Sequence, residues 1–174
     1  MSKLILEKIE LVKNILGDDP FSLVIGEIVE EETPIKEKLE DNILKDYYFM
    51  TRKYKILNGG VITIYGQQRL ESIQFYVEDM PGGADKWICI VTIENYPLFI
   101  NKINGDVCCL FGDLIDQNFV IESYGDFNSF LQNYYLGKNY CELGNKFVQS
   151  EGISDTVGSK DDDWYQLLED NNLL

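Results

Sequence analysis

The feature that most constrains the fold of this chain is an uncharged run of seven residues, Trp87 to Ile93, with the sequence WICIVTI. Nearly all of its side chains are apolar, and most are β-branched. Successive side chains of a β-strand point to opposite faces of a sheet, so a strand this apolar needs cover on both faces. The run therefore predicts a central strand that is buried on both sides.

Further strands are predicted around this run from a hydrophobic period of two. VITIY at 61–65 is typical of one strand, and the alternation of Ile73, Phe75 and Val77 indicates another. Pro81-Gly82-Gly83 then marks a turn.

A hairpin is predicted after the central run. The apolar segments 98–103 and 106–111 flank Asn104-Gly105, the dipeptide favoured in a two-residue type I′ turn. The two segments are therefore expected to be adjacent antiparallel strands.

Two helices are predicted before the strands. One spans residues 2–16, and its apolar stripe at i, i+4, i+7 and i+11 consists of Ile5, Ile9, Val12 and Leu16. The other starts at Pro34, with Thr33 as its cap, and runs to Leu57, either continuously or with a break near Asp41-Asn42. Asn58-Gly59-Gly60 is expected to end it, since Asn and Gly tolerate the left-handed conformation of a helix C-terminus.

A third helix is predicted after the strands, with Ser123 as its cap and Asp126 three residues later. Its apolar stripe at i, i+3, i+4 and i+7 consists of Phe127, Phe130, Leu131 and Tyr134. Burial of such side chains contributes about 1.5–3 kcal/mol each, so this helix should pack onto the sheet.

The order of elements predicts an α+β fold: a twisted, mainly antiparallel meander sheet, flanked by N-terminal and C-terminal helices that cover one face. One domain is expected at 1–150. Residues 151–174 form an acidic C-terminal extension, in which 151–163 is a polar linker. Trp164, Leu167 and Leu168 suggest a short docked helix at the end of this extension.

The composition excludes several kinds of chemistry. The chain has no histidine, which removes Ser-His and Cys-His nucleophile pairs, histidine general bases and the common His-containing metal sites. The formal net charge of −15 argues against nucleic acid and anionic membranes as partners. Glu7 and Glu10 interrupt the first apolar run, so it is neither a signal-peptide core nor a membrane span, and a cytoplasmic protein is expected.

Four cysteines, Cys89, Cys108, Cys109 and Cys141, show no CxxC spacing. Neither a disulfide framework nor a zinc site is expected, and buried reduced thiols are the simplest interpretation. Cys108 and Cys109 are neighbours on a predicted strand, so one should point into the core and the other outward, where it could be oxidised.

Carboxylates are the abundant reactive groups. The acidic runs Glu30–Glu32 and Asp161–Asp163 are interpreted as solvated surface. A carboxylate-dependent hydrolase would need two acids held about 5–9 Å apart across a cleft. The acids that could converge in this way are Glu71, Glu78, Asp79 and Glu94.

The charge is unevenly distributed. Residues 1–57 contain 12 acids and 9 bases, for a net charge of −3, whereas residues 58–174 contain 18 acids and 6 bases, for −12. This excess serves solubility in the simplest interpretation. The alternative is an acidic docking surface for a basic protein.

Three segments resemble a known family. LKDYYFMTRKYKILNGG at 44–60 is similar to the helix-to-strand junction of the SUKH superfamily, YPLFINKINGDVCCLF at 96–111 to its paired strands, and SYGDFNSFLQNYYL at 123–136 to its closing helix. This superfamily joins bacterial immunity proteins of polymorphic toxin systems to fungal cell-wall-synthesis regulators. The resemblance implies an α+β fold, no catalysis, and neutralisation of a toxin domain, commonly a nuclease or deaminase, by direct binding. An acidic tail is frequent in such members and is similar to residues 161–170.

The leading hypothesis is therefore a cytoplasmic, non-catalytic immunity-type protein that binds a basic toxin domain. No catalytic residue, metal or cofactor is expected, and the protein should be a monomer or a weak homodimer. The candidate partner-binding residues flank the predicted strands and are Glu71, Glu78, Asp79, Glu94, Asp113 and Asp116. A regulatory protein-binding scaffold and a carboxylate-dependent hydrolase are the alternatives.

Overall fold

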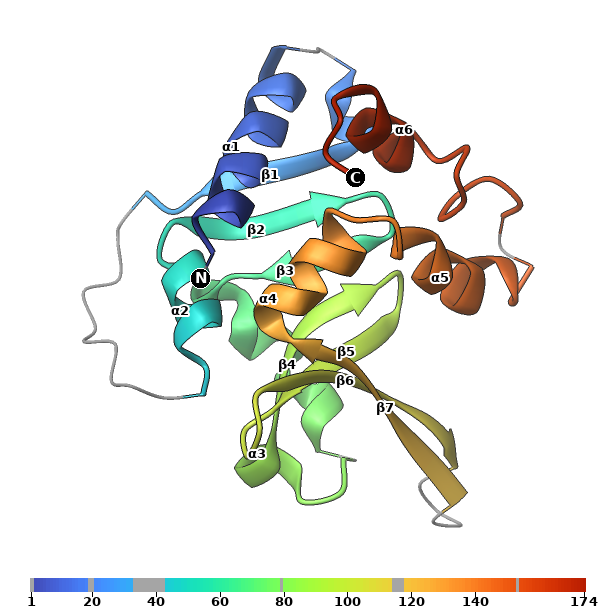
Figure 1. Ribbon diagram of the computed structural model, residues 1–174. Helices are drawn as coiled ribbons and strands as arrows, with labels where there is room; N and C mark the ends of the chain where they lie inside the picture. The colour runs from blue at the N-terminus through green and yellow to red at the C-terminus, as the bar shows by residue number, and fades with distance from the viewer. Residues whose placement is uncertain (1, 19–20, 33–42, 79, 114–117, 153) are drawn as a thin grey trace.

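Seven strands form one antiparallel sheet, in which each strand pairs with the next strand along the chain (Figure 1). The computed structural model describes residues 2–18, 21–32, 43–78, 80–113, 118–152 and 154–174. The strands are β1 (Gly26–Glu30), β2 (Tyr54–Gly59), β3 (Ile62–Tyr65), β4 (Trp87–Ile93), β5 (Tyr96–Asn101), β6 (Asp106–Asp113) and β7 (Asn118–Asp126). The predicted α+β meander is confirmed.

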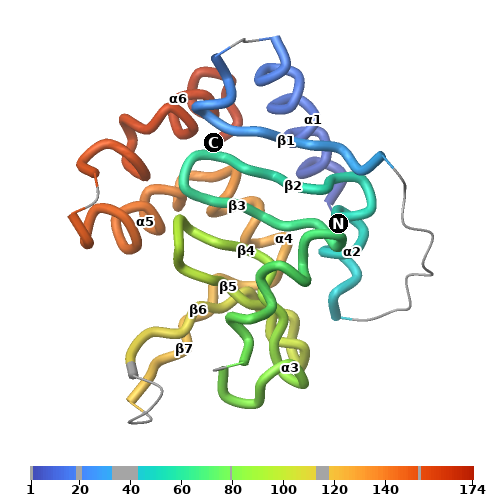
Figure 2. Tube along the Cα trace, turned by 180° about the vertical axis from the view of Figure 1, so that it is seen from behind, coloured from blue at the N-terminus to red at the C-terminus, as the bar shows by residue number. Residues whose placement is uncertain are grey.

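Helices lie on both faces of this sheet. The larger layer contains α1 (Lys3–Asp18), α2 (Lys45–Thr51), α4 (Phe127–Phe130) continued by η3 (Leu131–Tyr135), α5 (Tyr140–Gly144) continued by η4 (Asn145–Gln149), and α6 (Asp163–Asp170). The smaller layer contains the 3₁₀-helical segment η2 (Gln67–Val77). Two short helical turns, η1 (Ser22–Val24) and α3 (Gly83–Lys86), complete the described helices. Helix α4 lies in front of the sheet in Figure 1 and behind it in Figure 2. None of the described helices is long and apolar enough to cross a membrane.

Strand β4 is buried along its whole length, as predicted for the central strand. Ile88 and Ile93 face the main core under the larger helical layer, whereas Trp87 and Cys89 face a second cluster under η2. The pairing of β4 with β5 skips one residue at Ile90, which is a β-bulge. The sequence predicted helices on one face of the sheet only. That prediction is incomplete, because η2 covers part of the other face.

The segment that forms η2 corrects a strand prediction. Leu70, Ile73 and Val77 are spaced at i, i+3 and i+7, which is helical spacing. They form the face of η2 that packs against the sheet. Phe75, the middle residue of the predicted alternation, is 58% exposed. The alternation of Ile73, Phe75 and Val77 was coincidental.

Strand β2 corrects the C-terminal part of the second predicted helix. Thr33 to Asn42 lie outside the described residues, α2 ends at Thr51, and Tyr54 to Gly59 are extended. Tyr54 and Leu57 both face the main core although they are three residues apart, because the pairing with β1 skips Lys55. The bulge therefore produces a spacing that looks helical in the sequence.

The β5–β6 connection is longer than the predicted two-residue turn. Phe99 pairs with Cys108 and Ile100 with Val107, so β5 ends at Asn101, and the loop contains Lys102 to Gly105. Gly105 has a φ of +84° and donates its N–H to the Asn101 carbonyl at 2.8 Å. Asn104 does not take the positive φ that a type I′ turn requires at both central positions.

The closing helix is confirmed, but its cap is Asp126 instead of Ser123. The Asp126 carboxylate accepts a hydrogen bond from the Ser129 backbone N–H at 2.7 Å. Ser123 lies within β7, which the sequence did not predict as a strand; β1 and β2 were not predicted as strands either. Phe127, Phe130 and Leu131 pack into the main core as expected.

The predicted C-terminal helix is also confirmed, and α6 packs into the main core. The Trp164 side chain is fully buried, and its indole N–H donates to the Tyr135 carbonyl at 2.9 Å. A side chain on Gly59 of β2 would come within 2.4 Å of the Trp164 ring. Glycine at this position is what lets α6 approach the sheet.

Replacing Trp164 with Ala should lower the free energy of unfolding by about 3–5 kcal/mol, because it leaves a cavity between α6 and β2. Urea unfolding followed by circular dichroism measures this change. Leu23→Ala is the matched control, since Leu23 is 74% exposed, and its effect should stay within about 0.5 kcal/mol. Equal effects of the two substitutions would contradict the docked position of α6.

Candidate functional site

Two of the six candidate acids lie together on the face of the sheet that η2 covers. Glu71 lies within η2 and Glu78 directly follows it; both are exposed and line one open cleft of about 840 Å³. Glu94 lies in the β4–β5 turn with a φ of +51°, at the opposite end of β4 from the cleft residue Trp87.

The remaining three candidates are only partly described. Asp113 is the last residue of β6, and its side chain is outside the described structure. Asp79 and Asp116 lie outside the described residues altogether. The structure therefore brings Glu71 and Glu78 together and separates Glu94 from them.

Gln74 holds η2 against the sheet. Strand β3 ends at Tyr65 and pairs with β4 only as far as Val91, so β3 does not reach Cys89. The Gln74 amide takes the place of a strand there: its NH₂ donates to the Cys89 carbonyl at 2.8 Å, and its oxygen accepts from the Cys89 N–H at 3.2 Å. Buried backbone groups need such partners, so Gln74 fixes the position of η2.

The floor of the cleft is apolar. Trp87 is buried, and its indole N–H donates to the Pro81 carbonyl at 2.8 Å. Lys86 places its Nζ 5.0 Å from the Trp87 ring centroid. Phe75 is largely exposed at the wall of the cleft, and its ring centroid lies 4.1 Å from that of Tyr76. The cleft thus offers aromatic surface beside two carboxylates.

The charges around the cleft are mixed. Lys102 lines it and donates to the Ala84 carbonyl at 2.6 Å, which connects α3 to the β5–β6 loop. Glu71 also borders a neighbouring hollow of about 540 Å³ with Lys55 and Arg69. Glu78 borders the first of these two hollows but not the second.

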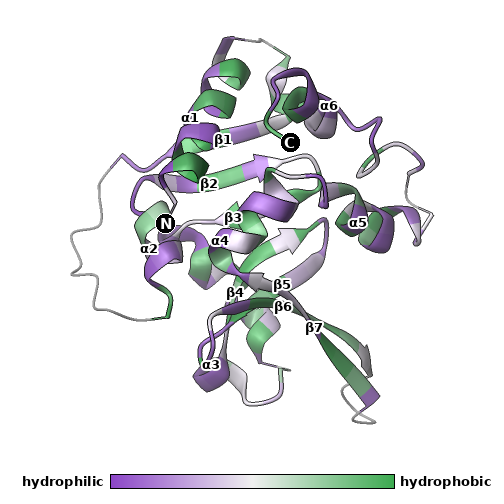
Figure 3. Cartoon of the chain, viewed as in Figure 1, coloured by the Kyte–Doolittle hydropathy of each residue, from purple (hydrophilic) through white to green (hydrophobic). Residues whose placement is uncertain are grey.

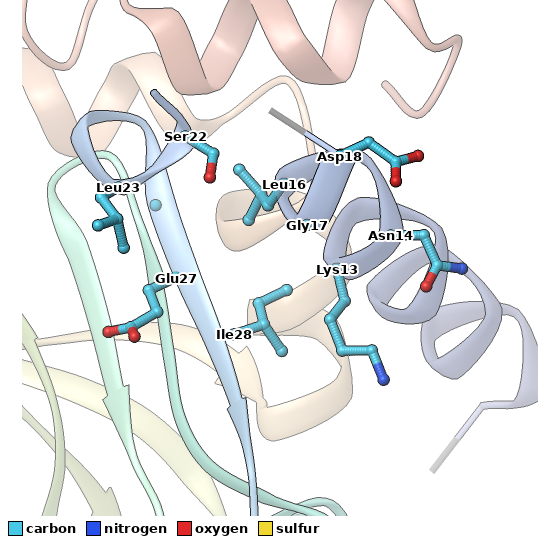
Figure 4. Close-up of a pocket in the computed structure, with 10 residues that line it drawn as sticks. Lys13, Asn14, Leu16, Gly17, Asp18, Ser22, Leu23, Glu27 and Ile28 are labelled. Carbon is cyan, nitrogen blue, oxygen red and sulfur yellow. The ribbon is translucent and has the colours of Figure 1, made fainter. Parts of the chain in front are cut away.

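A third open pocket, of about 720 Å³, lies between α1 and β1 (Figure 4). Leu16 and Ile28 reach into the gap, whereas Asn14 and Asp18 point away from it. Lys13, at the edge of this pocket, is bound to Glu30 at 2.6 Å and to Glu10 at 3.2 Å. This pocket contains none of the candidate residues.

Glu10 is the centre of an ion-pair network that connects α1 with β2 and, through Lys13 and Glu30, with β1. Its carboxylate accepts hydrogen bonds from Lys53, from the Tyr54 hydroxyl and from Lys13, so α1 is joined to the start of β2. Partial burial alone would raise the pKa of Glu10, but these three donors lower it to about 2. The network is structural; the i,i+3 spacing of Glu10 and Lys13 could indicate one of its pairs, whereas the contacts with Lys53 and Tyr54 depend on the fold.

The lowered pKa of Glu10 predicts a loss of stability in acid. A carboxyl group with a lowered pKa stabilises the folded state above its ordinary pKa of 4.5, and this contribution disappears as the pH falls toward 2. Because the group is partly solvent-exposed, we expect a contribution of only about 1 kcal/mol. Glu10→Gln should lower stability at pH 7 and remove that part of the pH dependence in urea titrations at pH 2–7. An unchanged acid profile would contradict this role.

The cysteines correct one expectation. Cys108 and Cys109 do point to opposite faces, but both are buried, because Cys109 packs in the main core and Cys108 in the cluster under η2. Burial raises the pKa of Cys108 to about 11, with a further contribution from Asp106, and burial raises the pKa of Cys89 and Cys109 to about 12. Neither member of the vicinal pair is the exposed, oxidisable thiol that the sequence suggested.

These three thiols should be unreactive in the folded protein. At pH 8 only about one in a thousand Cys108 side chains would be thiolate, and the thiolate is the reactive form. Titration with a chromogenic disulfide should therefore detect no more than Cys141, which is partly exposed, until the protein is unfolded. Rapid modification of Cys108 or Cys109 at pH 8 would contradict their burial.

Among the described residues, no group of three or more Cys, Asp or Glu side chains could hold a metal ion. The chain has no match among protein-family models, curated proteins or solved structures. Sequence reasoning identified Glu71 and Glu78 but missed Gln74, Phe75 and Trp87 as parts of one cleft, although the helical spacing of Leu70, Ile73 and Val77 could have indicated η2.

Proposed function

We propose that this chain is a non-catalytic immunity-type protein that binds a cognate toxin domain in the cytoplasm and blocks its active site or substrate groove. The observation that carries the proposal is the open cleft beside η2, where exposed aromatic surface and two carboxylates lie together. The resemblance of residues 44–60, 96–111 and 123–136 to the SUKH superfamily supports the same function.

The chemistry of the cleft suits a basic protein side chain. An Arg or Lys side chain has an apolar stem and a charged end, so its stem can cover Phe75 while its head approaches Glu78 or Glu71. Protein interfaces commonly combine an apolar centre with a polar rim. The cleft has apolar surface from Phe75 at its wall, over the buried Trp87, and two exposed carboxylates beside it.

The charge of the chain favours the same class of partner. A nuclease holds phosphate groups with basic residues, and an acidic protein surface can compete for them. The net charge of −12 over residues 58–174 would also accelerate the encounter with a basic domain. Neutralisation by occlusion needs no chemical step from this chain.

The direct test is co-expression with the toxin domain encoded beside the gene. The proposal expects growth to be rescued and the two proteins to elute as one complex in size-exclusion chromatography. Failure of both rescue and complex formation would reject the immunity function. Turnover of a glycoside or phosphoester by the purified chain, lost on Glu→Gln substitution, would favour a hydrolase instead.

Charge reversal should locate the binding face. The double variant Glu71→Lys, Glu78→Lys is expected to weaken toxin binding by about ten- to a hundredfold, mainly through slower association, and to reduce its salt dependence. Glu78→Lys should have the larger single effect, because Glu71 lies beside Lys55 and Arg69. Surface plasmon resonance at two salt concentrations measures both quantities.

A matched control is the double variant Glu169→Lys, Asp170→Lys, which reverses two exposed charges on α6, in the larger helical layer. It changes the net charge by the same amount and should alter affinity far less. Equal effects of the two double variants would show that overall charge, and not the cleft, governs binding.

A further inference from the structure

Strand β7 is an open edge of the sheet. Within the described structure it pairs only with β6, and it is nine residues long. The β6–β7 hairpin extends away from the helices in both Figure 1 and Figure 2. The backbone N–H and C=O groups on the outer side of such a strand are free to bind another strand.

The distal half of β7 is apolar. Phe119, Val120 and Ile121 follow one another, and Figure 3 shows that the projecting part of the hairpin is largely hydrophobic. Val120 is 68% exposed and Ile121 is 37% exposed. Val120 pairs with Phe111 and Ile121 with Leu110, so apolar side chains lie on both faces of the hairpin.

This edge lacks the usual protection against pairing. Natural edge strands are kept short or carry Lys, Pro or a bulge. Strand β7 contains no Lys and no Pro, and its bulge lies near Asp126, away from the apolar half. The opposite edge, β1, is protected by its length of only five residues; each edge strand also carries one ion-paired Glu, Glu30 to Lys13 of α1 and Glu122 to Lys146 of η4.

The charge of the hairpin indicates the kind of strand that it would accept. Strands β6 and β7 carry four acids and no Lys or Arg; the acids are Asp106, Asp113, Glu122 and Asp126. Lys146 pairs with Glu122 and lies over the Phe111 ring, so it compensates one of these four charges and the hairpin remains acidic. A second copy of this chain would bring an equally acidic strand and another charge of −15, so it is a poor partner.

We propose that β7 binds an extended segment of a partner protein, in which Lys or Arg alternates with apolar residues, as an additional strand of the sheet. Backbone hydrogen bonds would provide affinity, and the acids beside β7 would select the basic side chains. Leu110, the partner of Ile121, packs in the same cluster as Ile73 and Val77 of η2. One face of the added strand is therefore continuous with the side of the sheet that carries the η2 cleft.

The inference rests on the proposed function only for the identity of the partner, so it can be tested without the toxin. The probe is a blocked nine-residue peptide that alternates Lys with Val, titrated into the ¹⁵N-labelled full chain. Amide shifts should concentrate in residues 118–126, and amide exchange should slow at alternate residues there, because an added strand bonds every second residue. The same peptide with Glu in place of Lys should bind at least about tenfold more weakly.

Val120→Lys should weaken binding of the basic peptide about tenfold, since a charged residue on an edge opposes strand pairing. Val24→Lys is the control: Val24 is 84% exposed and precedes β1 at the other edge, and this variant should change affinity by less than about twofold. Shifts that map to β1 or the η2 cleft, or equal binding of the acidic peptide, would overturn the proposal. Self-association of the free chain that Val120→Lys abolishes would also overturn it and would identify a second copy as the occupant.

The two proposals can fail separately. A toxin complex in which exchange of the β7 amides is unchanged would reject the β7 edge and leave the immunity function standing. Protection of β7 by the basic peptide, without rescue or complex formation with the toxin, would reject the immunity function and retain the binding edge.

Discussion

Strand β4 determines how the rest of the chain is arranged. Its seven residues are all buried, so apolar surface must cover both faces of the sheet at this point. The larger helical layer covers one face, and η2 covers the other. Because β3 stops before Cys89, the Gln74 side chain completes the hydrogen bonding of β4 and holds η2 in place. The cleft that carries Glu71 and Glu78 exists because η2 covers only part of that face of the sheet.

The parts of the fold that follow a regular local period were predictable from sequence. Helix α1 and the helix that begins at Phe127 each show an uninterrupted helical period, β4 is a continuous apolar run, and each was found where expected. Strand β2 was not predictable in this way. Its bulge at Lys55 places Tyr54 and Leu57 on one face, and that spacing depends on the pairing with β1, which lies far away in sequence.

The candidate site was also predictable only in part, because its residues are brought together by the packing of different elements. Glu71 and Glu78 were selected as residues beside strands, yet they are neighbours because η2 is helical and crosses β4. Gln74 has its role only because β3 is short, and nothing near Gln74 in the sequence indicates this. The β5–β6 turn is a further case: Asn104-Gly105 favours a tight turn, but the strand register leaves a four-residue loop from Lys102 to Gly105.

The η2 cleft and the β7 edge are the two features on which the proposed binding depends. The η2 cleft places Phe75 beside Glu71 and Glu78, and the distal half of β7 exposes Val120 on an acidic hairpin. We propose that a basic protein partner binds the η2 cleft and the β7 edge. Hydrogen–deuterium exchange of the chain, alone and in complex with the neighbouring toxin domain, tests it most directly. The account predicts slower exchange in residues 67–78 and 118–126 and no change in 3–18 and 163–170; protection confined to α1 and α6 would contradict it.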